Sequence, residues 1–141
     1  MATALFVCVH NAGRSAMSEV LFEGAAGGRH RALSAGTHPA ARVHPEVVDA
    51  MRELGMDLSD RTPRTLTREL AGEADVVVTM GCGDECPYVP GLKRGDWPLD
   101  DPKGRPLEQV RRIRDEVRDR VAALVDQYGW GQSTPPSGAR F

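Results

Sequence analysis

Long hydrophobic runs, lysine and aromatic residues are all scarce in this chain of 141 residues. A helix that crosses a membrane needs about 18 or more consecutive apolar residues, and no segment provides them, so we expect no membrane association. The first residues, MATALFVCV, have no basic start and no small-residue cleavage pattern. Their composition argues against a secretion signal and predicts a cytoplasmic protein.

A strong charge of either sign is also lacking. The formal net charge is −2, acidic and basic residues are interspersed, and only 2 of the 18 basic residues are lysine. The charged positions of a late helix account for most arginines, so we expect no basic face and no nucleic-acid partner. Cysteine occurs three times. Without a secretion signal these cysteines are better candidates for reactive thiols than for a disulfide framework.

Strands and helices alternate along the hydrophobic pattern. Short apolar or β-branched runs predict strands at residues 4–8, 31–36, 75–80 and 96–102. Apolar residues at helical spacing predict helices at residues 17–25, 44–55, 66–71 and 107–128. This alternation indicates an α/β fold, an open parallel sheet with helices on both faces.

One domain is expected over residues 1–128, followed by a flexible tail over 129–141 that is rich in Gly, Pro and Ser. Ligands of open parallel sheets bind beyond the carboxyl ends of the strands. Cys8, the loop after Met80 and the turn after Leu99 should therefore meet at one edge of the sheet.

The segment VCVHNAGRS, residues 7–15, carries a cysteine at the end of a predicted strand and an arginine at the start of a helix. Its backbone N–H groups and the helix dipole favour a tetrahedral oxyanion, and the same environment favours the thiolate of a cysteine. Arg14 supplies a bidentate guanidinium, and Ser15 is placed to donate a hydrogen bond to Cys8. The oxyanion-binding residues are expected to be Val9, His10, Asn11, Ala12, Gly13, Arg14 and Ser15.

Two plainer interpretations compete with an oxyanion loop. A buried cysteine followed by an arginine could be an ordinary strand-to-helix connection, although its place directly before a helix disfavours this. A Walker-type nucleotide loop ends in Gly-Lys-Ser/Thr, and NAGRS has no lysine.

CVHNAGRS resembles the Cys-x5-Arg-Ser/Thr signature of the low-molecular-weight protein tyrosine phosphatase superfamily, and DDP at residues 100–102 resembles its general-acid loop. The resemblance covers residues 4–128. SAG, VVTM, a CP pair and W-x-x-DDP make it closer to the arsenate reductases of that superfamily. It implies a four-stranded parallel sheet, Cys8 as nucleophile, Arg14 as oxyanion clamp and Asp101 as acid, with Asp100 as the alternative carboxylate.

Phosphatases and arsenate reductases of this kind share the attack by the cysteine on a tetrahedral oxyanion. Tyrosine phosphatases place aromatic residues after the acid, whereas this chain has DPKG and only two tyrosines in total. It carries CGDEC after the third strand instead, and thiols supply electrons for a reduction. The prediction is therefore an arsenate reductase, with a phosphotyrosine or small phosphate ester phosphatase as the alternative.

Two routes for the electrons follow from the resemblance. In the first, Cys82 attacks Cys8, Cys86 attacks Cys82, and thioredoxin reduces the resulting disulfide. This chain departs from that pattern because its two cysteines are closer together and Gly81 precedes Cys82. In the second, mycothiol attacks the Cys8 adduct and a glutaredoxin-like redoxin completes the reduction, which suits the arginine-rich composition. A zinc site at Cys82 and Cys86 is disfavoured because no second ligand pair lies nearby.

Some relatives bind potassium through residues that match Asn11, Glu19, Ser34 and an aspartate. In this chain DLSDRTPR places Arg64 at the aspartate position, and its guanidinium would compete with a cation. We expect no functional metal site, no bound cofactor, and a monomer that uses a thiol reductant. A redox-regulated protein that binds oxyanions without turnover is disfavoured because an acid is present.

Overall fold

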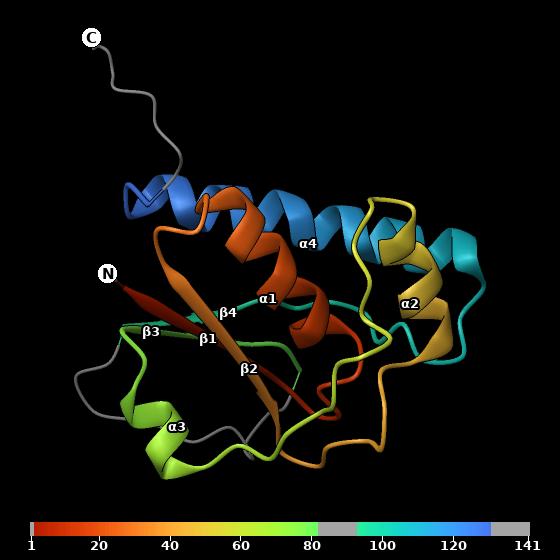
Figure 1. The fold of residues 1–141 in the computed structure, drawn as a ribbon, viewed down its shortest axis with the longest axis horizontal. Coiled ribbons are helices and arrows are strands. Elements are labelled where there is room, and N and C mark those ends of the chain that lie inside the picture. Colours follow the sequence, from red (N-terminus) through yellow and green to blue (C-terminus); the bar gives the residue numbers. More distant parts are fainter. Residues whose placement is uncertain (1, 82–92, 131–141) are drawn as a thin grey trace, which may run out of the picture.

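The computed structural model describes residues 2–81 and 93–130. These residues contain four strands and four helices (Figure 1). In chain order they are β1 (Thr3–Cys8), α1 (Arg14–Ala25), β2 (Arg31–Gly36), α2 (Pro45–Arg52), α3 (Arg68–Gly72), β3 (Val76–Thr79), β4 (Lys93–Asp96) and α4 (Leu107–Gln127).

The strands form one parallel sheet in the order β2-β1-β3-β4. β1 is an inner strand, and its last residue, Cys8, pairs with Gly36 of β2. Val7 pairs with Thr79 of β3, and Thr79 pairs with Asp96 of β4. The strands thus end together at the edge where Cys8 lies. The predicted α/β class and open four-stranded parallel sheet are confirmed.

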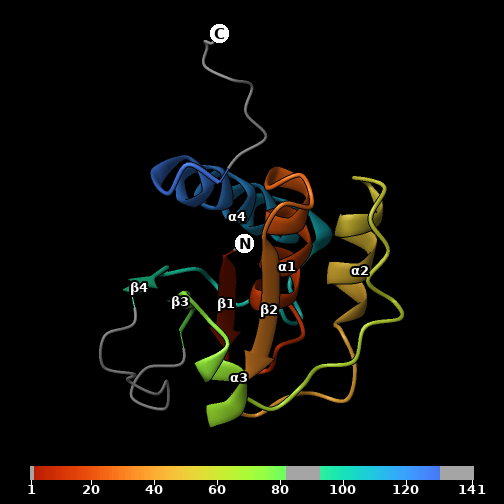
Figure 2. The same ribbon diagram turned by 60° about the vertical axis from the view of Figure 1, so that its left-hand side comes forward.

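Helices cover the two faces of the sheet unequally. Helices α1, α2 and α4 lie on one face, and the short α3 lies on the other (Figures 1 and 2). The side chains of β1 alternate accordingly, because Phe6 packs in the larger cluster with the long helices and Leu5 packs in the smaller cluster with Ala71 of α3. Phe6 also contacts the rings of Phe22 and Trp97, each with ring centroids 5.7 Å apart. The larger of the two hydrophobic clusters therefore lies between the sheet and the helices α1, α2 and α4.

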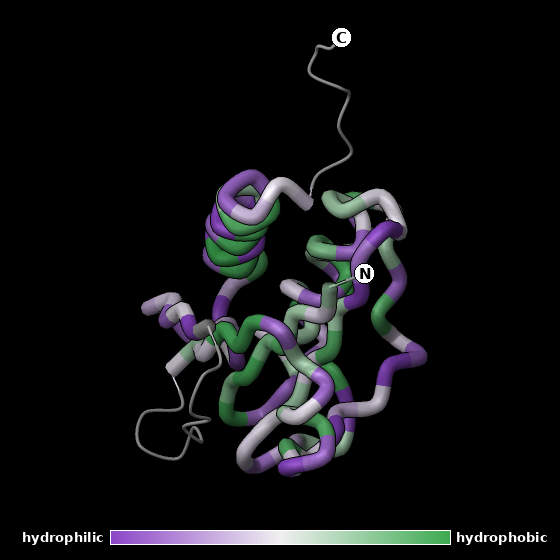
Figure 3. The backbone as a smooth tube through the Cα atoms, turned by 90° about the vertical axis from the view of Figure 1, so that its left-hand side faces the viewer, coloured by the Kyte–Doolittle hydropathy of each residue, from purple (hydrophilic) through white to green (hydrophobic). Residues whose placement is uncertain are grey.

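Helix α4, which was predicted over residues 107–128, buries one apolar face. Its buried residues include Val110, Ile113, Val117, Val121, Leu124 and Val125. Hydrophobic and hydrophilic residues alternate along the turns of this helix, whereas hydrophobic colours dominate in the central strands (Figure 3). Within the described residues, no helix combines the length and the apolar character that a membrane span requires.

The last strand was predicted at the wrong place. The expected segment was residues 96–102, but β4 ends at Asp96. Trp97 donates one more backbone hydrogen bond to Thr79, and Pro98 then has no N–H group with which to continue the pairing. Trp97 and Leu99 are buried in the core from an irregular segment, so their apolar character was mistaken for that of a strand.

Helix boundaries also differ from expectation. Helix α1 begins at Arg14 instead of residue 17, and helix α2 ends at Arg52, with Gly55 following in a turn with a φ of 77°. Near the end of the described residues Trp130 stacks on Tyr128 with ring centroids 4.6 Å apart and contacts His30. Residues 131–141 of the expected tail lie outside the described residues.

Candidate active site

Residues 9–13 connect β1 to α1 as a tight loop at the carboxyl edge of the sheet. Asn11 adopts a φ of 51°, a left-handed conformation that asparagine tolerates better than most residues. Gly36 of the neighbouring strand lies against this loop, and a Cβ at Gly36 would lie 2.6 Å from the Val9 carbonyl oxygen. A side chain there would push the loop outward, so a glycine in SAG keeps the loop on the sheet edge.

The thiol of Cys8 lies at the base of this loop, with 2% of the residue exposed. The Ser15 hydroxyl oxygen is 2.9 Å from its Sγ, and the backbone N–H of Asn11 donates to Sγ over 3.3 Å. The Asn11 side-chain amide donates to the Ser15 hydroxyl over 2.8 Å. Because that hydroxyl accepts from Asn11, its own proton is free to point at Cys8. Two hydrogen-bond donors therefore converge on the sulfur.

Arg14 opens α1 and is buried, with 7% of the residue exposed. Its Nη1 donates to the Leu99 carbonyl over 3.2 Å, and its Nη2 lies 3.8 Å from Asp101 Oδ2. Its Nε is buried and has no hydrogen-bond partner among the described residues. A buried guanidinium N–H without a partner is a strong donor for an anion. Within the part of the chain that the structure describes, Arg14, the predicted oxyanion clamp, thus retains a free donor.

Gly81, two residues beyond the end of β3, also lies against Arg14. It has a φ of 82°, and a Cβ at this position would lie 2.6 Å from Arg14 Nη1. The sequence pattern did not reveal this contact because the two residues are far apart in the chain. The predicted thiols Cys82 and Cys86 lie outside the described residues.

The two aspartates of the acid loop point in different directions. Asp101 faces Arg14, its side chain is 41% exposed, and it accepts a hydrogen bond from the Lys103 N–H over 3.0 Å. Asp100 lines a separate surface hollow together with Arg105 and other residues at the start of α4. The acid loop touches the oxyanion loop directly, because a Cβ at Gly13 would lie 2.7 Å from the Pro102 side chain. Asp101 is therefore the carboxyl group oriented toward the thiol loop.

Two histidines lie at the outer side of the loop. The rings of His10 and His44 meet edge to face with centroids 6.2 Å apart. Burial lowers the pKa of His44, and the nearby carboxylates of Glu46 and Asp101 oppose this effect only in part. His44 is therefore a predominantly neutral imidazole near neutral pH. Sequence reasoning placed His10 in the loop but did not pair it with His44.

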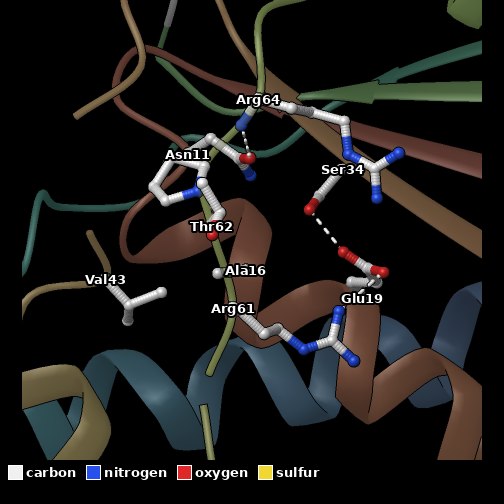
Figure 4. A pocket seen from close by; sticks show the side chains of 9 residues that line it. Asn11, Ala16, Glu19, Ser34, Val43, Arg61, Thr62 and Arg64 are labelled. Carbon is white, nitrogen blue, oxygen red and sulfur yellow. Dashed lines mark hydrogen bonds and ion pairs between the residues drawn. The ribbon is translucent and has the colours of Figure 1, made fainter. Parts of the chain in front are cut away.

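A carboxylate behind the loop is neutralised by an unexpected arginine. Glu19 is 6% exposed, accepts a hydrogen bond from Ser34, and pairs with Arg61 Nη1 at 2.7 Å (Figure 4). The sequence predicted that the Arg64 guanidinium would compete with a cation here. In the structure Arg61 is the residue that pairs with Glu19, and the Arg64 backbone N–H donates to Asn11 Oδ1 over 3.0 Å. Among residues 2–81 and 93–130, no three His, Cys, Asp or Glu side chains converge as a metal site would require.

The family model of low molecular weight phosphotyrosine protein phosphatases matches residues 3–131. The chain belongs to this family. This membership confirms the predicted resemblance and agrees with a sheet whose first strand delivers Cys8 to the loop before α1.

Within the family, the chain is similar to proteins named as arsenate reductases. A candidate arsenate reductase of Halobacterium salinarum is 45% identical over 128 residues, which cover 87% of this chain and 90% of the relative. Glutaredoxin arsenate reductase of Synechocystis is 35% identical over 128 residues, which cover 89% of this chain and 97% of the relative. A solved thioredoxin-dependent arsenate reductase of Corynebacterium glutamicum superposes with a TM-score of 0.80 at 37% identity. That superposition covers 92% of this chain and 62% of the other.

Proposed function

We propose that this chain is an arsenate reductase in which Cys8 attacks the arsenic atom. The observation that carries the proposal is the set of hydrogen bonds at the Cys8 sulfur, to the Ser15 hydroxyl and from the Asn11 N–H, together with a buried Arg14 at the start of the same loop-to-helix segment whose Nε has no partner among the described residues. A tetrahedral oxyanion placed against the thiolate would receive these donors and the loop amides. The names of the relatives support arsenate as that oxyanion.

In the first step the Cys8 thiolate forms a sulfur–arsenic bond and one arsenic–oxygen bond breaks. The Arg14 guanidinium and the loop N–H groups stabilise the negative charge on the remaining oxygens. Asp101 donates a proton to the departing oxygen, which leaves as water. Its partial exposure allows the carboxyl group to exchange protons with solvent afterwards.

In the second step another thiolate attacks the Cys8 sulfur. A disulfide bond forms, the sulfur–arsenic bond breaks, and its electron pair stays on arsenic, so arsenic(V) becomes arsenic(III) and arsenite leaves. The two thiols supply the two electrons. In the thioredoxin route the attacking thiol is Cys82 and Cys86 completes the exchange. In the mycothiol route the attacking thiol comes from mycothiol.

The comparisons support a thiol donor without selecting one. The Corynebacterium glutamicum protein is named as thioredoxin-dependent, and the Synechocystis protein is named as a glutaredoxin enzyme. Arsenate and a redoxin are therefore the partners we propose, with the chain acting as a monomer.

A phosphatase is the second candidate, because the same nucleophile, clamp and acid suffice to hydrolyse a phosphate ester. The family name favours it. The segment after Pro102, however, continues with Lys103 and Gly104. Neither residue provides the ring that would clamp an aryl group.

The proposal is tested by supplying arsenate with thioredoxin and its reductase, or with mycothiol and its redoxin, and measuring arsenite. Sustained release with one system supports the proposal. No arsenite with either system, together with rapid aryl phosphate hydrolysis, would replace it with the phosphatase.

A single-turnover measurement separates the two routes. In the thioredoxin route the fully reduced protein should release about one arsenite per chain without any donor, because its own thiols supply both electrons. In the mycothiol route it should release none until mycothiol is added. Cys86→Ser should stop multiple turnover with thioredoxin and leave turnover with mycothiol largely intact.

A further inference from the structure

The carboxylate of Glu19 is buried behind the oxyanion loop and needs a counter-charge. Its residue is 6% exposed, and burying an ionised carboxylate without a partner is costly. Ser34 donates one hydrogen bond to it, and the Arg61 guanidinium supplies the positive charge at 2.7 Å. Arg61 also lies 3.7 Å from Glu23 Oε1, and burial together with Glu19 raises the pKa of Glu23. Arg61 is therefore the cation between two acidic side chains of α1.

A continuous chain of hydrogen bonds links the segment that carries Arg61 to the nucleophile. Three residues later, the Arg64 N–H donates to Asn11 Oδ1, and the Arg64 carbonyl accepts from the Gly36 N–H over 2.9 Å. The first bond fixes the orientation of the Asn11 amide, whose Nδ2 then donates to Ser15. Ser15 in turn contacts the Cys8 sulfur. A shift of residues 61–64 would thus alter the hydrogen bonds that the Cys8 sulfur receives.

The donor atoms at this place do not fit a metal cation. Both carboxylate oxygens of Glu19 are already engaged, one by Ser34 and one by Arg61. The Asn11 carbonyl oxygen accepts the Arg64 N–H. A cavity of about 170 Å³ lies between α1, Ser34 and residues 61–64, and the Arg61 guanidinium extends beside Glu19 there (Figure 4). A positively charged group thus already lies beside Glu19, where the resemblance implies potassium in some relatives.

We propose that Arg61 is a positioning residue that takes the place of a monovalent cation and keeps Asn11, Ser15 and Cys8 in their oxyanion-binding arrangement. Removing its side chain leaves Glu19 and Glu23 without their shared counter-charge and enlarges the cavity beside them. Two carboxylates around an empty polar space attract a small cation. The arrangement should therefore become dependent on potassium when Arg61 is lost.

The test measures binding of inorganic phosphate to the full chain by calorimetry, in potassium chloride and in choline chloride at equal ionic strength. The unaltered protein should bind phosphate equally well in both salts. Arg61→Ala should bind about tenfold more weakly in choline chloride, the effect of losing roughly one charge-assisted hydrogen bond. Potassium chloride should restore its affinity to within about twofold. Thermal melting should show the same dependence on the salt.

Three further variants make the test specific. Arg61→Lys keeps the charge and should bind phosphate equally in both salts. Arg31→Ala removes an arginine from an exposed ion pair with Glu73 and should not gain a dependence on potassium. Arg64→Ala should not gain it either, because the backbone N–H that holds Asn11 remains.

Three results would overturn the role of Arg61. These are a potassium requirement in the unaltered protein, an Arg61→Ala loss that is equal in both salts, and a potassium dependence that follows Arg64 instead of Arg61. The proposal rests on the oxyanion loop of the proposed function. Because phosphate binding involves no arsenic reduction, a failure of the reductase proposal and a failure of this one give different results.

Discussion

Replacing Gly81 with alanine tests whether the chain next to β3 holds the oxyanion clamp in place. Gly81 has a φ of 82°, and its missing side chain leaves room for the guanidinium of Arg14. In Gly81→Ala the new methyl group would lie 2.6 Å from Arg14 Nη1, closer than a Cβ atom can stand to another heavy atom. Arg14 would have to move away from the Leu99 carbonyl, to which that nitrogen now donates.

The substitution has two separate costs. A left-handed conformation costs an alanine about 1–2 kcal/mol, which lowers the melting temperature by roughly 3–8 °C. A displaced Arg14 would lose one charge-assisted hydrogen bond to a bound oxyanion, worth about 1.5–3 kcal/mol. That loss corresponds to about 10- to 150-fold weaker oxyanion binding.

Gly55→Ala is the matched control. Gly55 has a φ of 77° with no atom within 4 Å of the added Cβ, so this variant bears the backbone cost alone. Calorimetric titration with arsenate or phosphate should show weak binding only for Gly81→Ala, although both variants melt at lower temperatures. If the oxyanion affinities of the two variants were within about twofold of each other, the position of Arg14 would not depend on the absence of a side chain at Gly81.

Four further substitutions have expected outcomes. Ser15→Ala removes the hydroxyl 2.9 Å from Cys8 Sγ, so alkylation of Cys8 by iodoacetamide at pH 7 should slow about tenfold, and an unchanged rate would contradict the hydrogen bond. Asp101→Asn should lower the turnover number by about 10²- to 10⁴-fold while phosphate still binds. Asp100→Asn should change the turnover number less than about twofold. Equal effects of the two substitutions would contradict the role of Asp101 as the general acid. Hydrogen bonds from Arg111 and Arg114 lower the pKa of Glu53 from 4.5 to about 2. The contribution of ionised Glu53 to the stability of the folded protein is therefore complete above about pH 4.5 and is lost as the pH falls toward about 2. The difference in melting temperature between the unaltered protein and Glu53→Gln should shrink over that pH range. A difference that stays constant would contradict this linkage.

The thiol loop could be predicted from the sequence because its parts are contiguous. A buried strand, a short polar loop with one glycine and a helix start all lie within residues 4–15. The conformation that each favours brings Cys8, Ser15 and Arg14 together without help from distant residues. The sheet could be predicted for the same reason, because the spacing of apolar residues that distinguishes a strand from a helix is a property of a short segment.

The contacts that could not be predicted join distant or irregular segments. Gly81 meets Arg14 across 67 positions of the chain. Arg61 and Arg64 lie in one loop without periodicity, so nothing in the sequence indicates which guanidinium turns toward Glu19. The last strand was misplaced because Trp97 and Leu99 are apolar, while the prolines around them end the pairing.

The most direct test of the proposed chemistry is the amount of arsenite formed from arsenate over many turnovers, measured by chromatography with arsenic detection. With a complete thioredoxin or mycothiol system, arsenite should accumulate in excess over the protein, and Cys8→Ser should abolish its formation. If neither system yielded arsenite, or if Cys8→Ser formed it at an unchanged rate, Cys8 would not be the nucleophile of an arsenate reductase.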